Sequence, residues 1–151
     1  VSSLGIIMML AVDNVLAVGR PCPGVTARFE QIAPLDGSRW GVFSVRNGGA
    51  TVIRFLLAGL VAGSSRMELH PLSYNIHSQL PGSADWLPDM TIGTFDKPEG
   101  LVDLKGGESA DLYVNVEQVF DDRYPPGTSF FVKFRAADSK CSVRSGKFQR
   151  G

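Results

Sequence analysis

The stretch that decides the fold is Ser109-Ala-Asp-Leu-Tyr-Val-Asn-Val116, the most regular alternating segment of the chain. Leu112, Val114 and Val116 are separated by single residues, which is the two-residue period of a strand with one buried face. A Lys-Gly-Gly-Glu sequence at 105–108 comes just before, and glycines of this kind allow the chain to reverse between strands. The stretch therefore predicts a β-strand that follows a tight turn.

The same period recurs on both sides of this strand. Alternating segments occur at 25–30, 43–46, 53–57, 67–76, 130–136 and 141–148. Turn-forming residues separate them, in keeping with the 17 Gly and nine Pro of the chain. No amphipathic helix longer than three turns is indicated. We therefore predict an all-β fold, an immunoglobulin-like antiparallel β-sandwich of about seven strands joined in hairpin order.

The 151 residues correspond to one domain. Residues 4–12 form an apolar run that is too short to span a bilayer but suits the hydrophobic region of a secretory signal. Because no Met or basic residue precedes the run, we expect residues 1–17 to be a truncated signal segment and residues 18–151 to form the sandwich. The alternative is that the apolar run is a buried first strand or a short core helix.

Three stretches carry a resemblance to a known class of proteins: Phe43-Ser-Val-Arg-Asn-Gly-Gly49, the region from Val102 to Val116, and the region from Pro126 to Phe134. Together they resemble the bacterial extracytoplasmic immunoglobulin-like or fibronectin-like modules. The resemblance covers most of residues 25–148 and implies an architecture only. Such modules serve as adhesins, spacers, inhibitors and carbohydrate binders.

The two cysteines lie near opposite ends of the chain. In hairpin order the first and seventh strands begin at the same end of the sandwich, and Cys22 precedes the first while Cys141 opens the seventh. We therefore expect a disulfide between them, which an exported protein could form. A pair of buried, unreactive thiols is the alternative. The expected localisation is periplasmic or extracellular.

The net charge of zero, from 15 basic and 15 acidic side chains, argues against a nucleic-acid binder. The charges are unevenly distributed along the chain. Residues 61–120 carry three basic and nine acidic groups, whereas residues 121–151 carry seven and three. An acidic middle next to a basic C-terminal part favours a partner that is itself basic, unless neighbouring strands pair these charges.

No catalytic or metal-binding motif is present. The chain lacks a nucleophile elbow and a phosphate-binding loop, and its acidic loops lack the spacing of a calcium site. His70 and His77 are an odd number of residues apart, so an ideal strand would place them on opposite faces. We expect no enzyme activity, no bound metal and no cofactor.

The candidate binding site is the long loop from Leu80 to Gly100. Trp86 is the type of residue most enriched at binding hot spots, although the loop could instead fold it over the end of the sandwich as a lid. Counting strand reversals places this loop at the same end as Gly48-Gly49 and residues 138–140. The predicted binding residues are Asp85, Trp86, Leu87, Asp89 and Met90, with Tyr124 in the opposite loop as a weaker candidate.

Basic side chains gather near the C-terminus, at Lys140, Arg144, Lys147 and Arg150. We interpret them as protection of an exposed sheet edge, with a specific anion site as the alternative. As a function we expect a non-catalytic exported binding protein, such as an inhibitor, an immunity-type factor or an adhesion module, that recognises a protein through its end loops. The alternative is a structural or decoration subunit of a surface or virion assembly.

Overall fold

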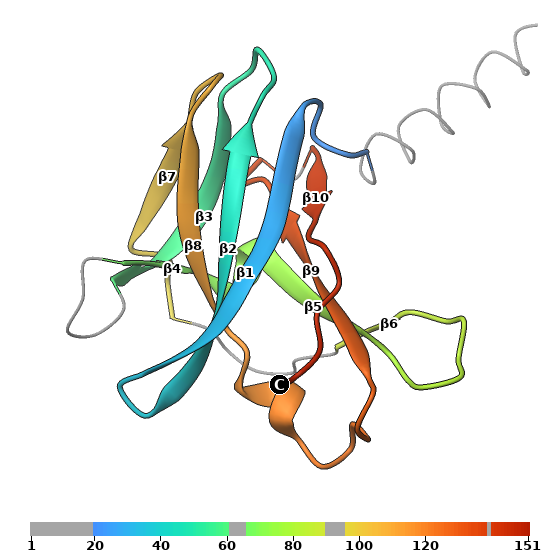
Figure 1. Cartoon of the computed structure of the whole chain (residues 1–151). Coiled ribbons are helices and arrows are strands. Elements are labelled where there is room, and N and C mark those ends of the chain that lie inside the picture. The colour runs from blue at the N-terminus through green and yellow to red at the C-terminus, as the bar shows by residue number, and fades with distance from the viewer. Residues whose placement is uncertain (1–19, 61–65, 90–95, 139) are drawn as a thin grey trace, which may run out of the picture.

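The computed structural model describes residues 20–60, 66–89, 96–138 and 140–151 (Figure 1). The predicted signal segment at 1–17 lies outside them, as does the candidate Met90. The described chain consists of ten strands and two short 3-10 helices: β1 (Val25–Leu35), β2 (Ser38–Asn47), β3 (Ile53–Leu60), β4 (Met67–Leu69), η1 (Pro71–Ser73), β5 (Tyr74–Gln79), β6 (Leu87–Pro88), β7 (Gly100–Leu104), β8 (Ser109–Asn115), η2 (Glu117–Phe120), β9 (Ser129–Arg135) and β10 (Ser142–Arg144).

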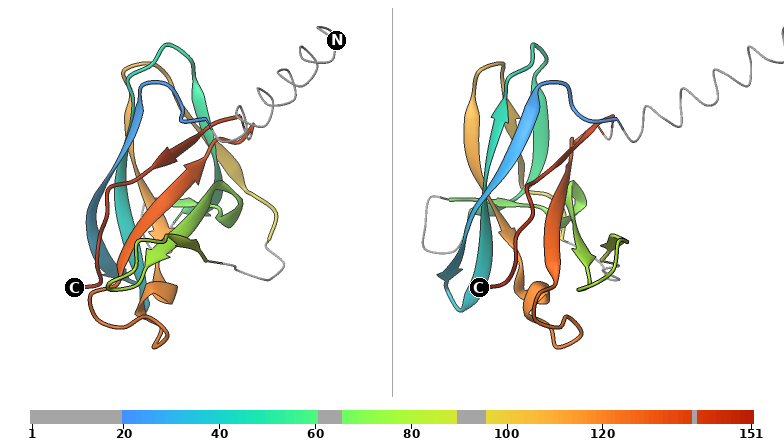
Figure 2. Two further views of the ribbon diagram at one scale, coloured as in Figure 1. Left: turned by 90° about the vertical axis from the view of Figure 1, so that its right-hand side faces the viewer. Right: turned by 45° about the vertical axis from the view of Figure 1, so that its right-hand side comes forward.

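The strands form two sheets that pack face to face, so the predicted all-β sandwich is confirmed (Figure 2). The large sheet has the order β1-β2-β8-β4-β3-β7, and the small sheet has the order β10-β9-β5-β6. The described residues contain ten strands where about seven were expected. The additional ones are short: β6, for example, has only two residues.

The hairpin order expected from the sequence is wrong. β8 lies between β2 and β4, and it runs parallel to β4. Residues 67–76, expected as one strand with a bend at Pro71, are two strands in different sheets, with η1 carrying the chain from one to the other. Counting strand reversals along the sequence therefore fails here, because the chain changes sheet between β4 and β5.

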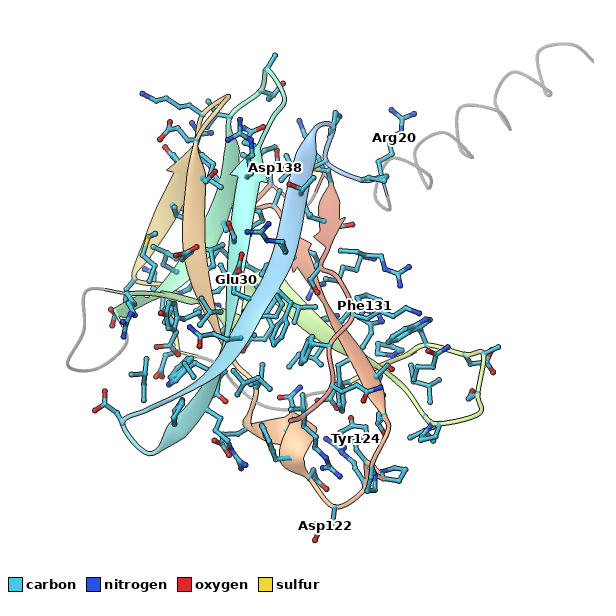
Figure 3. All side chains as sticks on the ribbon, in the orientation of Figure 1. Arg20, Glu30, Asp122, Tyr124, Phe131 and Asp138 are labelled. Atoms are coloured by element: carbon cyan, nitrogen blue, oxygen red, sulfur yellow. A yellow bond between two sulfur atoms is a disulfide. The ribbon has the colours of Figure 1, made fainter. Side chains whose placement is uncertain are left out.

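The position predicted for the loop after β5 is therefore wrong as well. Gln79, at the end of β5, pairs with Ser129 at the start of β9. The loop consequently lies at the end of the sandwich that holds Tyr124, which Figure 3 shows opposite the end that holds Asp138. It was expected beside Asp138.

The core lies between the sheets and is rich in aromatic rings. Phe43, Phe55 and Phe134 are fully buried, and the Phe43 ring meets the Phe134 ring edge to face at 5.3 Å. Phe148, in the segment after β10, stacks on Phe29 of β1 at 4.5 Å. Aromatic pairs add to the stability that their buried area provides.

The predicted disulfide is present in the structure, between Cys22 and Cys141. It joins the segment before β1 to the residue before β10. Two backbone hydrogen bonds flank it, from the Cys22 amide to the Ser142 carbonyl and from the Ser142 amide to the Arg20 carbonyl, both 2.9 Å long. Residues 20–22 therefore cover the outer edge of β10. No helix in the described ranges is long and apolar enough to cross a membrane.

Candidate binding surface

The outer face of the small sheet carries an unusual row of side chains. β9 alternates as the sequence predicts, with Phe130, Val132 and Phe134 in the core. Phe131 and Lys133 consequently point outward. The strand register sets Phe131 opposite His77 of β5, and His77 opposite Pro88 of β6.

Phe131 is only 4% exposed although it lies on an outer face. Trp86 covers one side of it, with ring centroids 4.7 Å apart at an interplanar angle of 62°. His77 stacks on it almost in parallel, at 4.6 Å and 8°. Trp86 itself is half-buried. It is therefore not a lid over the end of the sandwich, because the loop folds back and places its ring on the side of the small sheet.

A groove runs beside these rings, with a volume of about 610 Å³. One wall comes from Pro21 and the first residues of β1, and the other from β9, β10 and the Trp86 ring. We call it the Trp86 groove; it is lined by Pro21, Val25, Thr26, Ala27, His77, Trp86, Phe131, Lys133, Ser142, Val143 and Arg144.

Cations surround the groove. Arg144 of β10 places its guanidinium 3.8 Å from the centroid of the Phe131 ring and 5.9 Å from that of Trp86. The Lys147 ammonium lies 5.6 Å from the centroid of Trp86. Contacts of this kind are favourable because the ring face is negative. No carboxylate occurs among the described residues that line the groove.

His77 is held in its neutral form by this environment. Burial lowers the pKa of its imidazole, and the positive charges of Lys133, Arg144 and Arg135 lower it further. Its Nε2 atom is enclosed and has no hydrogen-bond partner among the described groups. A neutral His77 adds an aromatic surface to the groove at neutral pH.

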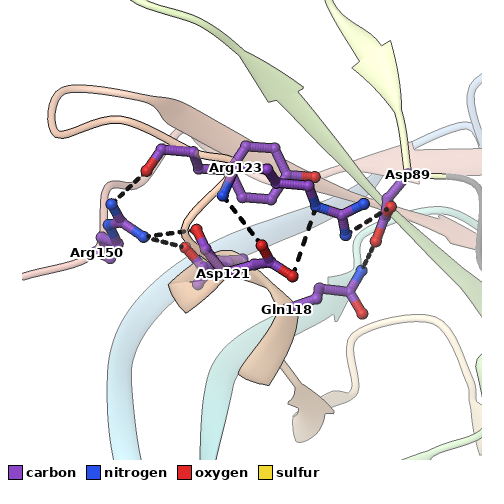
Figure 4. Close-up of polar contacts among 7 residues, drawn as sticks. Asp89, Gln118, Asp121, Arg123 and Arg150 are labelled. Atoms are coloured by element: carbon purple, nitrogen blue, oxygen red, sulfur yellow. Dashed lines mark hydrogen bonds and ion pairs between the residues drawn. The ribbon is translucent and has the colours of Figure 1, made fainter.

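Asp89 has an internal role. Its carboxylate accepts hydrogen bonds from the Gln118 side chain and from Arg123 Nη2, the latter at 3.3 Å (Figure 4). Its amide donates to the Ile76 carbonyl. These contacts attach the residue that follows β6 to β5, η2 and the turn after η2. Asp89 therefore positions the loop that carries Trp86.

The remaining predicted residues lie apart from the Trp86 groove. Leu87 is 54% exposed and lines a smaller hollow of about 310 Å³ with Asp89 and Tyr124. The Tyr124 ring is buried and meets Phe130 edge to face at 5.1 Å. Asp85 is exposed in the loop. The structure thus brings three of the predicted residues together around this hollow and places Trp86 on a different side of the loop.

Phe131 and His77 were not assigned to a site from the sequence, and Arg144 was interpreted as protection of a sheet edge, with an anion site as the alternative. One signal was available, namely an aromatic residue at an outward position of β9 with Lys133 two residues further on. A large ring at a position that would otherwise face water needs a cover or a partner. Which segment covers Phe131 depends on the three-dimensional path of the loop.

The other histidine has a structural role. His70 Nδ1 accepts a hydrogen bond from the Leu72 amide at 3.1 Å, and Nε2 lies 2.6 Å from the Asp96 carbonyl, to which it donates. The ring thereby caps η1. In the described part of the chain no group of three or more His, Cys, Asp and Glu side chains could hold a metal ion.

Comparisons of the chain with protein-family models, with curated proteins and with solved structures found no match.

Proposed function

We propose that the chain is an exported, non-catalytic binding protein that recognises a protein partner through the Trp86 groove. The observation that carries this proposal is the half-buried Trp86, whose ring forms a groove wall together with Phe131 and Arg144. Trp and Arg are the residues most enriched at binding hot spots. The groove also falls within the usual size range of ligand sites.

Two further features support the proposal. The Cys22–Cys141 disulfide supports an oxidising, extracytoplasmic environment, periplasmic or extracellular. The contacts of both histidines support a binding role over catalysis, because His70 holds backbone groups and His77 is stacked against Phe131.

Selection of peptides from a random display library on the immobilised protein tests the proposal. We expect the selection to enrich families of related peptides that bind the wild type and Leu87→Ala but fail to bind Trp86→Ala. Leu87 is the matched control, because it is the next residue of the chain, at the start of β6, is exposed and does not line the groove. Selected peptides that bind all three proteins equally well, or a selection without enriched families, would reject the Trp86 groove as the recognition surface.

A further inference from the structure

We infer that the Trp86 groove binds an acidic, extended segment of a protein partner, with carboxylates paired to Arg144 and Lys133 and an apolar side chain against Trp86. This inference rests on the proposed function and names the chemistry of the partner. The partner is therefore acidic, and not basic as the acidic middle of the sequence predicts.

Arg144 and Lys133 carry positive charges that no neighbouring carboxylate compensates in the described part of the chain. In the register of the small sheet, Arg144 of β10 lies directly opposite Lys133 of β9, and like charges in this position destabilise a sheet. Among the described residues, no acidic side chain forms an ion pair with either cation or with Lys147. An anion bound between them would offset this repulsion.

The contact of Arg144 with the Phe131 ring leaves the N–H donors of its guanidinium available. Its guanidinium lies over the Phe131 ring, so one flat face is covered. The N–H donors of a guanidinium point outward in its plane, and stacking leaves them free. Arg144 makes no hydrogen bond within the described part of the chain through these donors. A stacked arginine with free edge donors is preorganised for a carboxylate, which accepts two parallel hydrogen bonds.

The sheet-edge interpretation of these basic residues does not account for Arg144. Residues 20–22 already cover the free edge of β10, since the Ser142 amide and carbonyl both bond to that segment. Pro21 also forms a parallel bridge with Ser142. An edge that is already paired needs no charge to repel another strand.

The lining of the groove favours a peptide over other polyanions. A sugar presents many hydroxyl groups, which side-chain amides and carboxylates commonly bind, and the described lining contains neither group. Its accessible apolar side chains, Val25 and Trp86, would instead contact an apolar side chain of a peptide. The net charge of zero gives the chain no general attraction for the polyanionic backbone of a nucleic acid.

Isothermal titration calorimetry with synthetic peptides tests this inference. The probe is a peptide in which glutamates alternate with valine and glycine, and the comparison peptides replace its glutamates with lysine or its valines with serine. We expect the acidic, valine-containing peptide to bind most tightly and its affinity to fall as salt is added. We expect Arg144→Gln and Trp86→Ala each to weaken its binding about tenfold or more, as the loss of a charged hydrogen bond or a hot-spot ring would.

Two control variants make the test specific. Arg46→Gln removes one positive charge from an exposed site on β2, and Leu87→Ala changes the residue after Trp86, away from the groove. Both should leave the affinity within about twofold of the wild type. Equal weakening by Arg46→Gln and Arg144→Gln would indicate general charge attraction and overturn the inference.

The inference can fail while the proposed function survives. If display selection yields peptides that depend on Trp86 but are neutral or basic, the groove binds proteins of another chemistry. Tighter binding of a sulfated oligosaccharide or an oligonucleotide than of the acidic peptide, with the same dependence on Arg144, would also overturn the inference. All variants are compared at a temperature where circular dichroism shows the wild-type fold.

Discussion

Asn47 is a single residue that organises one end of the sandwich. Its side chain is fully buried at the end of β2, and Nδ2 donates 2.8 Å hydrogen bonds to the carbonyls of Thr51 and Leu104. Its Oδ1 accepts from the Gly49 amide at 2.9 Å. A buried amide with these partners links β2, the turn after it and β7. The sequence indicated only a turn at this position.

We expect Asn47→Ala to lower the free energy of unfolding by about 3 kcal/mol, because two carbonyls, of which that of Leu104 is buried, and one amide lose their partner. Chemical denaturation of variant and wild type measures this loss. Asn115→Ala is the matched control: its Oδ1 accepts one bond from the Glu117 amide at a half-buried site, so the expected loss is about 1 kcal/mol. Equal losses for the two variants would contradict this role of Asn47.

His77 predicts a pH dependence of stability. Its pKa in the folded protein lies below the ordinary value of 6.5, through burial first and the nearby Lys133, Arg144 and Arg135 second. The unfolded chain therefore binds more protons than the folded one just below pH 6.5. Stability from this group is complete above that pH and is lost as the pH falls towards the folded pKa.

We expect His77→Phe, which keeps a ring against Phe131, to remove this contribution. The free energy of unfolding of the wild type, minus that of the variant, should decrease as the pH is lowered from 7 to 5. Urea denaturation across this range measures the difference, and every other titratable group is common to both proteins. A difference that stays constant over this range would contradict a lowered pKa for His77.

At the scale of elements, the strands with strong alternation were predictable and the connections were not. The pattern of β9 correctly predicted which of its residues face the core, because alternation is a local property of the strand. That Trp86 covers Phe131 depends on β6, a two-residue strand with no periodic signal of its own. The position of the loop was missed because η1 carries the chain between sheets, which residue types near Pro71 do not reveal.

The C-terminal segment acts as a further element of the small sheet. Phe148 forms an isolated bridge with Phe130 through two backbone hydrogen bonds of 2.8 Å, and its ring stacks on Phe29. Two residues further on, Arg150 donates hydrogen bonds to the carbonyls of Val119, Asp121 and Tyr124 (Figure 4). Arg150, expected to protect a sheet edge, therefore fixes the segment to η2 and the turn after it.

We expect Phe148→Ala to lower the free energy of unfolding by about 4 kcal/mol, because a buried ring at the side of the core is lost. Denaturation followed by circular dichroism measures it. Lys147→Ala, one residue away and exposed, should change stability by less than about 0.5 kcal/mol. If Phe148→Ala were as stable as Lys147→Ala, the segment would not be part of the folded core.

In the folded molecule, the basic and acidic residues that are unevenly distributed along the sequence lie in different places. Three cations of the C-terminal third, Lys133, Arg144 and Lys147, lie at the Trp86 groove, whereas Arg135 donates a hydrogen bond to Asn75. Several acids of the middle third are paired elsewhere: Asp103 with Arg54, Glu117 with Arg39 and Asp89 with Arg123. Counting charges along the chain could not show which of them would be neutralised by a neighbour.

The disulfide connects stability to the proposed site, because Cys22 and Cys141 adjoin opposite walls of the Trp86 groove. We expect the double variant Cys22→Ala/Cys141→Ala to lose about 4 kcal/mol, since the bond joins residues 119 positions apart. It should also bind the glutamate-containing peptide several-fold more weakly, because the backbone hydrogen bonds of Cys22 and Ser142 would then hold the wall at Pro21 without the covalent link. Denaturation and calorimetry at low temperature measure both effects. If stability fell but affinity did not, the disulfide would stabilise the fold without shaping the groove.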